Sequence, residues 1–576
     1  MAALPTLKNG LELKRAAPPA VFTGVMTCMF ALVLYIAVLI TMPATTQTLS
    51  ISSWVHSFQD TLGHLQLSKV LRTHWLHLIC AILVSMAGGG YAGYDAWDHA
   101  PLVEPFITPN PADPRIYYDE NARLKLRARF RTEAGRMAGR GIWLAPYVNL
   151  PFRLETRNLM IVGASGHGKS NLVRSYAHQM MRRGDHVLLH CNKGDVTQCF
   201  DLADVILISP AHRDGWAWDI AADIDGPAAA AEFSKDIIPA SDQPFWSDSA
   251  RLVLTDTIIA LSHEQGVEWG PGELLIMLLG KPQELRDRIA KIDLSASPLL
   301  GSGDEDAVDK TVQSIMSTLL SAAVTALRPM AYAWSNLPPE KRFSVKEWLS
   351  ETNTKPKVLI VQTSPNFEEM STTVCGGILR RVCKAVSDAS VAIDAKRRVS
   401  FVLDEMFSLG HVEGLGKALS VGREKGLVCV ATIQSMEQLN IYGKEAALLS
   451  DLFQIKIYSR LTAGAGADLA EKTVGSRDII WSAPNKHPEK DDKRLFVMRE
   501  ARMPVVTATR FTRDFGVFED DRGENYVRAI VHYAGAAHQL DWPLTVWNKV
   551  ADGFVAAPWT RFIRPAGEPA AGPVQR

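Results

Sequence analysis

A glycine-rich stretch in the first third of the chain has the residue types and the spacing that bind the phosphates of a nucleotide. It fits the pattern G-x-x-x-x-G-K-[ST] with the residues Gly163, Ala164, Ser165, Gly166, His167, Gly168, Lys169 and Ser170. Glycines let the backbone curl so that its N–H groups point at phosphate oxygens, and the positive end of a following helix strengthens the attraction. Lys169 is expected to reach the outer phosphates, and the Ser170 hydroxyl is expected to complete the shell of a Mg2+ ion. The stretch therefore predicts a site for ATP and Mg2+.

The neighbouring residues decide between this interpretation and a glycine-rich turn that carries Lys-Ser by chance. The apolar run Leu159–Val162 comes directly before the stretch, as a buried strand would, and Asn171–Arg183 has the composition of a helix. Strand, loop and helix in this order are the context that phosphate binding requires. We therefore favour the phosphate-binding loop.

Two acidic residues further along the chain are candidates for the chemistry. Phe401–Glu405 has the pattern of an apolar strand that ends in two acids. In enzymes with a phosphate-binding loop, an acid at this place holds the water shell of Mg2+, and an adjoining Glu can polarise the attacking water. Because a parallel sheet brings the carboxyl ends of its strands to one edge, both acids should lie near the loop. We assign Asp404 to the metal and Glu405 to the general base.

Three more polar residues are candidates for the same site. Gln434 follows the apolar run Leu427–Ile433, so it should lie on the same edge, where it could sense the γ-phosphate or hold the water. Arg423 stands at the expected end of a surface helix and could supply charge to the nucleotide of a neighbouring subunit. An ordinary surface arginine explains that position equally well. Arg460, after a strand expected at Gln454–Tyr458, is a second candidate of this kind.

The composition limits the classes of protein. With 576 residues the chain is too long for one hydrophobic core. Lys and Arg together number 62, as do Asp and Glu, so the net charge of zero excludes a uniformly basic coat for nucleic acid but not a local basic patch or pore. The seven cysteines include no C-x-x-C pair, so neither a zinc site nor a disulfide framework is indicated.

Two stretches near the N-terminus predict a membrane anchor. Residues 21–42 and 76–94 contain no Asp, Glu, Lys or Arg, and each is long enough to cross a hydrocarbon core as a helix. A secretory signal peptide is the alternative for the first stretch, but its length and the second stretch favour an anchor. Basic residues are slightly more frequent before the first stretch than between the two, which places the N-terminus inside. A nucleotide site also requires cytosolic ATP, so the remainder of the chain is expected in the cytoplasm.

The rest of the chain is expected to alternate between sheet and helical parts. Strands expected at Val187–His190, Val205–Ile208 and Val358–Val361 join the phosphate loop in a parallel α/β domain. Apolar positions at helical spacing between Val308 and Leu327 belong to an all-helical insert. Phe245-Trp246 near its start could stack on DNA, although buried core aromatics are commoner.

The predicted organisation has nine parts. They are a cytoplasmic N-terminus at 1–20, transmembrane helices at 21–42 and 76–94 around a short periplasmic loop at 43–75, a linker and the start of the cytoplasmic domain at 95–150, a nucleotide-binding domain at 151–225 and 346–535, an all-alpha insert at 226–345 and a C-terminal tail at 536–576. The linker region includes five basic residues between 123 and 131, which fit a solvated helix face and a contact to nucleic acid or lipid equally well.

With these residues placed, the chain resembles the type IV secretion coupling proteins, the TraD/TraG-like family of conjugation ATPases. The resemblance covers roughly residues 150–475 and the two-helix anchor. A phosphate-binding loop alone is unspecific, but here it belongs to an ordered series: Arg157-Asn158, Gly163 to Ser170, Lys193-Gly194-Asp195, Pro244-Phe245-Trp246, Leu403-Asp404-Glu405, Ser408-Leu409, Gly422-Arg423, Ile433-Gln434-Ser435, Gln438-Leu439 and Tyr442-Gly443.

The resemblance implies a homohexamer in the bacterial inner membrane, with a RecA-like motor domain and an all-alpha insert in the cytoplasm. Such proteins receive a complex of relaxase, relaxosome proteins and plasmid DNA, and they use ATP hydrolysis to drive single-stranded DNA and protein into the type IV secretion channel. Carried over by position, Lys169, Ser170, Asp404 and Glu405 would be catalytic. Gln434 would couple nucleotide state to DNA, and Arg423 would act in trans as an arginine finger.

Two departures from the family pattern limit what the resemblance implies. The family often has an acid where His190, Cys191 and Asn192 precede Lys193-Gly194, so a function for Asp195 does not follow. Many members carry a long acidic C-terminal tail that docks relaxosome proteins, whereas this chain ends in a stretch rich in Pro, Ala and Gly. Two alternatives stay open: a DNA translocase of the FtsK type, and a receptor that recruits protein substrates to a secretion channel.

Overall fold

The structure is a computed structural model of the chain. It describes residues 24–33, 79, 82–94, 106–107, 113–135, 139–192, 194–292, 295–301, 310–335, 337–388, 398–484 and 496–561. The chain divides into two compact units, one made of residues 1–114 and 476–505 and the other of residues 115–475 and 506–576. All the residues expected to bind or hydrolyse the nucleotide belong to the second unit.

A sheet of eleven strands forms the centre of the second unit. Seven of these strands are parallel neighbours in the order β13-β5-β12-β11-β6-β10-β7. In that order their bounds are Ile455–Tyr458, Leu159–Val162, Leu427–Ile433, Val399–Leu403, His186–Cys191, Val358–Gln362 and Val205–Ile208. The loop that follows β5 therefore opens between the carboxyl ends of β12 and β13.

The parallel strands are predominantly apolar, as expected for a sheet whose two faces are covered by helices. Every residue of β5, β11 and β12 is buried, which is typical of parallel sheets. The α/β class predicted from the sequence is thus confirmed. One boundary differs, because β11 ends at Leu403 and the two acids follow the strand instead of closing it.

Beyond β13 the sheet continues with antiparallel strands. β17 (Asn525–Tyr533) pairs with β13 on one side and with β18 (Ala536–Pro543) on the other. β16 (Gly516–Glu519) pairs antiparallel with β17, and β2 (Arg115–Tyr117) pairs parallel with β18. The prediction of a tail from residue 536 is therefore wrong at its start, since β18 is an inner strand.

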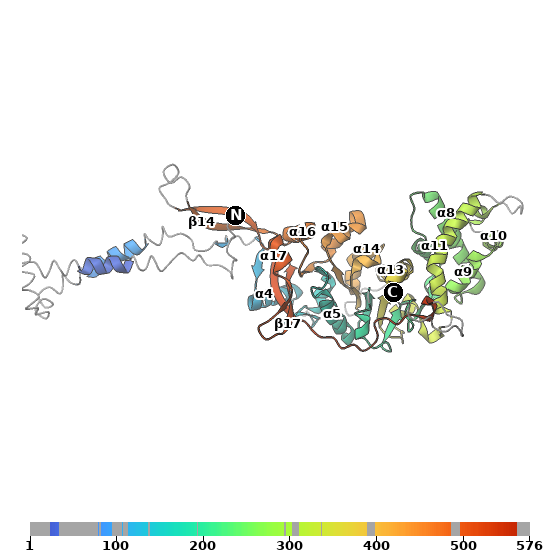
Figure 1. Ribbon diagram of the computed structural model, residues 1–576, viewed down its shortest axis with the longest axis horizontal. Helices are drawn as coiled ribbons and strands as arrows, with labels where there is room; N and C mark the ends of the chain where they lie inside the picture. The colour runs from blue at the N-terminus through green and yellow to red at the C-terminus, as the bar shows by residue number, and fades with distance from the viewer. Residues whose placement is uncertain are drawn as a thin grey trace, which may run out of the picture. The chain divides into compact units, whose positions relative to one another are not determined.

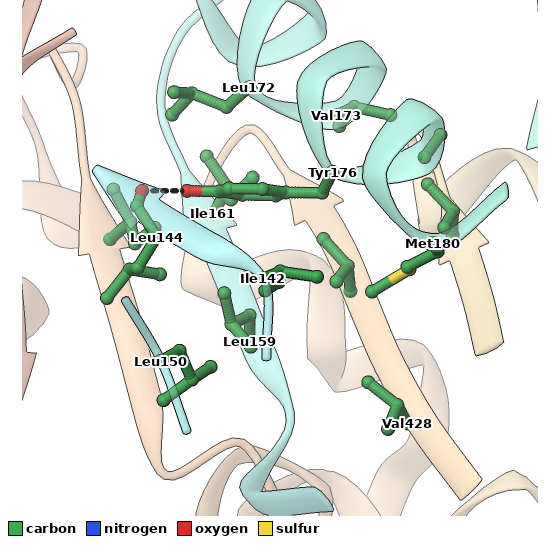
Figure 2. Close-up of a cluster of buried hydrophobic side chains, with 14 of the residues drawn as sticks. Ile142, Leu144, Leu150, Leu159, Ile161, Leu172, Val173, Tyr176, Met180 and Val428 are labelled. Carbon is green, nitrogen blue, oxygen red and sulfur yellow. Dashed lines mark hydrogen bonds between the residues drawn. The ribbon is translucent and has the colours of Figure 1, made fainter. Parts of the chain in front are cut away.

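Helix α5 (Lys169–Arg183) follows the phosphate loop and packs its apolar side against the sheet. Figure 2 shows four apolar side chains of this helix, Leu172, Val173, Tyr176 and Met180. They are directed toward side chains of the sheet and of the hairpin at residues 143–149, which precedes β5. The Tyr176 hydroxyl donates a 2.7 Å hydrogen bond to the carbonyl of Leu144 in β3 (Trp143–Ala145). Each large apolar side chain buried in this way contributes about 1.5–3 kcal/mol, so the helix that carries the loop is firmly held.

Helix α4 (Asp119–Ala134) lies within the predicted linker region and contains the basic stretch. It buries Leu126 and Phe130, whereas Lys125 and Arg131 are exposed. The basic side chains thus occupy the solvated side of a helix whose other side packs on the domain.

Helices make up the described residues between 227 and 334. The α-helices are α7 (Pro227–Ile237), α8 (Pro244–Gln265), α9 (Pro271–Leu279), α10 (Pro282–Ala290) and α11 (Lys310–Trp334), and α8 to α11 gather together in Figure 1. Phe245, at the start of α8, is 57% exposed. The interpretation of this aromatic pair as core is therefore wrong for Phe245.

After β18 the chain forms an extended segment that crosses the carboxyl edge of the sheet, and we call residues 544–561 the C-terminal strap. The amides of Val550 and Ala551 donate to the carbonyl of Gln198, in the loop after β6. Further on, the amide of Ala557 donates to the carbonyl of Ala211, after β7. The strap thus extends from β18 to the far end of the parallel strands.

The first unit contains a three-stranded sheet in which β14 (Ser476–Pro484) pairs with β15 (Phe496–Pro504) and with β1 (Phe106–Ile107). Helical residues at 24–33 and 82–94 belong to the same unit. The predicted spans at 21–42 and 76–94 lie partly outside the described residues. Within the described part, none of the helices combines the length and the apolar character needed to cross a membrane.

Candidate active site

The phosphate loop joins β5 to α5 and is held by the two strands beside it. The Gly163 amide donates to the carbonyl of Ile433 at the end of β12, and the Ala164 amide donates to the carbonyl of Arg460 just after β13. Ser459 donates its hydroxyl to the carbonyl of His167 at 2.7 Å. Both ends of the loop are therefore tied to the carboxyl edge of the sheet.

Glycine is required at Gly168, the residue before Lys169. Its φ is 87°, in the left-handed region that favours glycine. A Cβ there would lie 2.4 Å from a methyl group of Val527 on β17. The antiparallel extension of the sheet thus packs directly against the loop.

Lys169 is buried and turns its ammonium group back onto the loop. Its Nζ donates to the carbonyls of Gly163 at 2.6 Å and Ala164 at 3.0 Å. These two hydrogen bonds keep the Lys169 ammonium group inside the phosphate loop. Anionic phosphate oxygens would be stronger acceptors for this ammonium than neutral carbonyls.

Asp404 lies just beyond β11 and is 5% exposed. Thr432 donates its hydroxyl to Oδ1 of Asp404 at 3.0 Å and accepts a hydrogen bond from the Glu405 amide at 2.8 Å. Burial, together with the nearby charges of Asp195 and Glu405, raises the pKa of Asp404 to about 6. A divalent cation at this carboxylate would favour its ionised form, as a magnesium site requires.

Glu405 is held by two side-chain amides. Asn192 donates to its Oε2 at 3.0 Å, and Gln434 donates to its Oε1 at 3.4 Å. Glu405 itself has φ 51° and ψ 60°, a left-handed conformation that is uncommon outside glycine and recurs at functional sites. We call Asn192 and Gln434 the amide clamp, because together they fix both carboxylate oxygens.

The amide clamp is itself supported by further hydrogen bonds. The Thr363 hydroxyl donates to the Asn192 side-chain oxygen at 2.9 Å, and the backbone N–H of Gln434 donates to the side-chain oxygen of Gln438 at 2.8 Å. His190, on β6, lies next to the acids, and its Nδ1–H donates to the carbonyl of Asp404 at 2.7 Å. Burial lowers the pKa of His190 to about 4, so the ring is neutral at physiological pH.

One cavity of about 560 Å3 brings these groups together. Its lining consists of Ser165, Gly166, Gly168, Lys169, Ser170, Asn171, Arg174, Asn192, Asp195, Asp404, Glu405, Val517, Leu544, Thr545, Val546 and Trp547. The phosphate loop and both predicted acids thus share one cavity, and Gln434 reaches it through its contact with Glu405. Asp195 also lines the cavity and pairs with Arg174 at 2.9 Å.

The two arginine candidates lie in different places. Arg423 is exposed in a 3₁₀ turn (Gly422–Lys425) just before β12, at the amino end of the strand whose carboxyl end carries Gln434. Its own chain therefore does not bring it to the cavity. Arg460 lies beside the loop, where it donates to the carbonyls of Phe515 at 2.8 Å and Arg513 at 3.1 Å. Lys193 lies outside the described residues.

Several residues of the site were not identified from the sequence. Thr432 was detectable, because it is the one polar residue in the run Leu427–Ile433. Asn192 also follows a strand of the parallel sheet, as Asp404 and Gln434 do. Trp547 gave no such signal. It lines the cavity, but it lies 376 positions after its hydrogen-bond partner Asn171 in the chain.

The residues present fit ATP with Mg2+. In the described part of the chain, no three His, Cys, Asp or Glu side chains are placed to hold a metal by themselves. Mg2+ does not need such a cluster, because it typically takes one or two protein ligands and completes its shell with phosphate oxygens and water. Ser170 and Asp404 line the same cavity and have the oxygen atoms for this role.

Comparison with known proteins identifies a family. The family model described as the type IV secretion-system coupling protein DNA-binding domain matches residues 144–509, well over half of the chain. The coupling protein TraD of Escherichia coli (strain K12) is 24% identical over 334 residues, which are 57% of this chain and 45% of TraD. The match therefore spans less than half of that relative.

Solved structures share the fold. The plasmid coupling protein TrwB in complex with ADP and Mg2+ is 21% identical, with a TM-score of 0.59 over 77% of this chain and 97% of TrwB. TrwB in complex with a non-hydrolysable ATP analogue is also 21% identical, with a TM-score of 0.59 over 78% of this chain and 99% of TrwB.

Proposed function

Because the chain belongs to the coupling proteins of type IV secretion systems, we propose that it is an ATPase that drives DNA into a type IV secretion channel. The observation that carries this proposal is the arrangement of Glu405 in the amide clamp, within the same cavity lining as Lys169. A fixed carboxylate beside a phosphate loop is suited to orient and polarise an attacking water.

The phosphate loop and the polar residues beside it then have distinct roles. The loop amides and Lys169 bind the phosphates, and Ser170 and Asp404 hold Mg2+, which supplies charge neutralisation at the β- and γ-phosphates. Glu405 takes the proton of the attacking water. Gln434 contacts Glu405 and follows β12 directly, so it links the general base to a central strand of the sheet. TrwB, which shares the fold, was solved with ADP and Mg2+ and with an ATP analogue, which supports ATP and Mg2+ as the cofactors.

The proposed assembly is a homohexamer at the bacterial inner membrane. It would receive single-stranded plasmid DNA with its relaxase and relaxosome proteins and pass them to the channel components. The family description as a DNA-binding domain supports DNA as a partner. In the ring, Arg423 would complete the neighbour's nucleotide site. Its exposed position away from the cavity of its own chain is compatible with a role in trans.

The N-terminal segments 21–42 and 76–94 are proposed to anchor the chain as a helical hairpin. Between the described residues 24–33 and 82–94 the backbones approach closely, and a Cβ on Gly24 would lie 2.9 Å from the carbonyl oxygen of Gly89. Small residues at such crossings are typical of helices that pack in membranes. Deletion of residues 1–94 should move the protein from the membrane fraction to the soluble fraction. Retention in the membrane would contradict the anchor.

The central test is the ATP turnover of the purified full chain, with and without single-stranded DNA. We expect hydrolysis that DNA stimulates, and Lys169→Ala should abolish it because the ammonium that binds the outer phosphates is lost. The exposed Lys472 offers a matched control, since Lys472→Ala changes the same residue type on helix α16 (Ala465–Val474), away from the basic stretch of α4. Turnover that survives Lys169→Ala would refute the motor.

The same measurement separates the motor from a protein receptor. A receptor that recruits protein substrates would hydrolyse ATP without responding to DNA. DNA-stimulated turnover supports a motor that acts on DNA, and turnover that DNA leaves unchanged supports the receptor.

A further inference from the structure

The first four residues of the C-terminal strap, 544–547, are fastened to the start of helix α5. Asn171, the residue after Ser170, is the fastening point. Its Nδ2 donates to the carbonyl of Pro543 at 3.1 Å, and its Oδ1 accepts from the Thr545 amide at 3.1 Å and from Nε1 of Trp547 at 3.3 Å. Residues 544–547 are thus positioned by the same helical turn that carries Lys169 and Ser170.

The Trp547 ring is the end of a stack of three rings. It stacks on His178 of α5, with ring centroids 4.7 Å apart and planes at 15°. His178 stacks in turn on Phe200, also at 4.7 Å and with planes at 8°. Because the stack and the Asn171 hydrogen bond both fix Trp547, its ring is a rigid part of the cavity lining.

The cavity has two chemically different parts. The part that contains Lys169, Asp404 and Glu405 is charged, whereas Val517, Leu544 and Trp547 contribute apolar surface. Three polar side chains of the lining are already engaged, since Asp195 pairs with Arg174 and Asn171 binds the strap. The apolar part therefore offers contact area and few hydrogen bonds.

We propose that Val517, Leu544 and Trp547 form the wall against which the base of the bound nucleotide rests. This inference depends on the proposed function, in which the loop binds the phosphates of a nucleotide. The wall would contact the base of that same nucleotide. A nucleoside is a flat, largely apolar group attached to a polyphosphate, and its ring gains affinity from contact with aromatic and aliphatic surfaces. The segment 544–547 thereby makes the end of the chain part of the nucleotide site.

The test compares a ligand with a base and a ligand without one. Binding of ADP and of inorganic pyrophosphate to the full chain, both with Mg2+, is measured by titration calorimetry. We expect the wild type to bind ADP more tightly than pyrophosphate. Trp547→Ala should weaken ADP binding by about tenfold, as expected for the loss of a contact between an aromatic ring and a base, and leave pyrophosphate binding unchanged.

Two further variants separate recognition from folding. Trp547→Phe retains a ring that can stack on His178 and should keep ADP affinity within about threefold of the wild type. Trp559 is a matched control in the same strap, where its Nε1 donates to the carbonyl of Pro210 at 2.9 Å and its ring lies against Phe367. Trp559→Ala should leave the ratio of the two affinities unchanged.

Three results would contradict the proposal that these residues contact the base. If Trp547→Ala weakens ADP and pyrophosphate binding equally, the segment only supports the loop. If the wild type binds both ligands equally, the loop binds phosphates, as the proposed function requires, but the base has no site. If the wild type binds neither ligand, the proposed function fails together with this inference.

Discussion

Asp404 and Glu405 are neighbours in the chain but are held in different ways. Asp404 is buried beside the Thr432 hydroxyl, and burial raises its pKa to about 6. Glu405 turns away through a left-handed backbone conformation and reaches the two amides of the clamp. These different settings agree with the proposed roles, in which Asp404 holds the cation and Glu405 acts on the water.

The amide clamp should be needed for turnover but not for nucleotide binding. Gln434→Ala removes one of the two donors that fix Glu405, so kcat should fall by at least about tenfold because the general base is no longer oriented. The dissociation constant of ADP should not change, since Gln434 is not part of the cavity lining. Steady-state ATP hydrolysis and ADP titration measure the two quantities.

A double-mutant cycle shows whether Gln434 acts through Glu405. If it does, Gln434→Ala should cost little in a chain that already carries Glu405→Gln, because the effects of residues that act as a unit are not additive. Independent, multiplying losses would show that Gln434 has a separate role.

At the scale of elements, the parallel strands could be predicted, whereas the antiparallel strand β18 could not. β5 and β7 are uninterrupted apolar runs and β12 is interrupted only by Thr432, a pattern that identifies buried parallel strands on its own. β18 alternates buried and partly exposed residues, and its place depends on pairing with β17 and β2. The pairing with β2 joins distant parts of the chain, and no local pattern encodes it.

The same distinction holds for the site. The phosphate loop and the residues after β11 and β12 are local features of the sequence, so they could be named in advance. Trp547 could not be named in this way, because it reaches the loop only where the strap folds back on it. Phe245 was assigned to the core because aromatics are usually buried, yet it is exposed at the start of α8.

The pair β17–β18 also predicts how stability depends on pH. Burial lowers the pKa values of His532 and His538 to about 4, whereas in the unfolded chain a histidine titrates near 6.5. Below pH 6.5 the unfolded chain takes up protons that the folded chain does not, so the free energy of unfolding should fall as the pH drops from about 6.5 toward 4. His538, which is 2% exposed, should account for about 2 kcal/mol between pH 7 and pH 5.

Denaturant unfolding at a series of pH values measures this effect. His538→Gln should reduce the loss of stability between pH 7 and pH 5, because glutamine takes up no proton. His263 is exposed on α8 and provides the control, since His263→Gln should leave the pH dependence as it is in the wild type. An unchanged pH dependence in His538→Gln would contradict the prediction.

At the scale of the whole molecule, the two edges of the parallel sheet carry different groups. The carboxyl edge holds the phosphate loop, the acids and the strap, whereas Arg423 lies at the amino end of β12. An arginine in that position can complete a nucleotide site only on another subunit.

Mixing of inactive subunits tests this arrangement. Arg423→Ala and Glu405→Gln chains should each be nearly inactive. In a mixed ring, some sites pair an intact Glu405 with an intact Arg423 from the neighbour, so part of the ATPase activity should return. Turnover is measured over a range of mixing ratios. In the control, Lys417→Ala, a change on the preceding helix, replaces Arg423→Ala. Chains with Lys417→Ala should be active without any mixing. If no ratio restores activity, Arg423 is not a finger in trans.

The position of Trp547 has a consequence for how the protein is made. Asn171 and Trp547 are 376 positions apart in the chain, and a ribosome that adds about 5–20 residues per second needs about 20–75 s to cover that distance. Throughout this interval the phosphate loop is already synthesised while the last part of its cavity does not yet exist. The nascent chain therefore cannot form the complete nucleotide site until Trp547 has been synthesised.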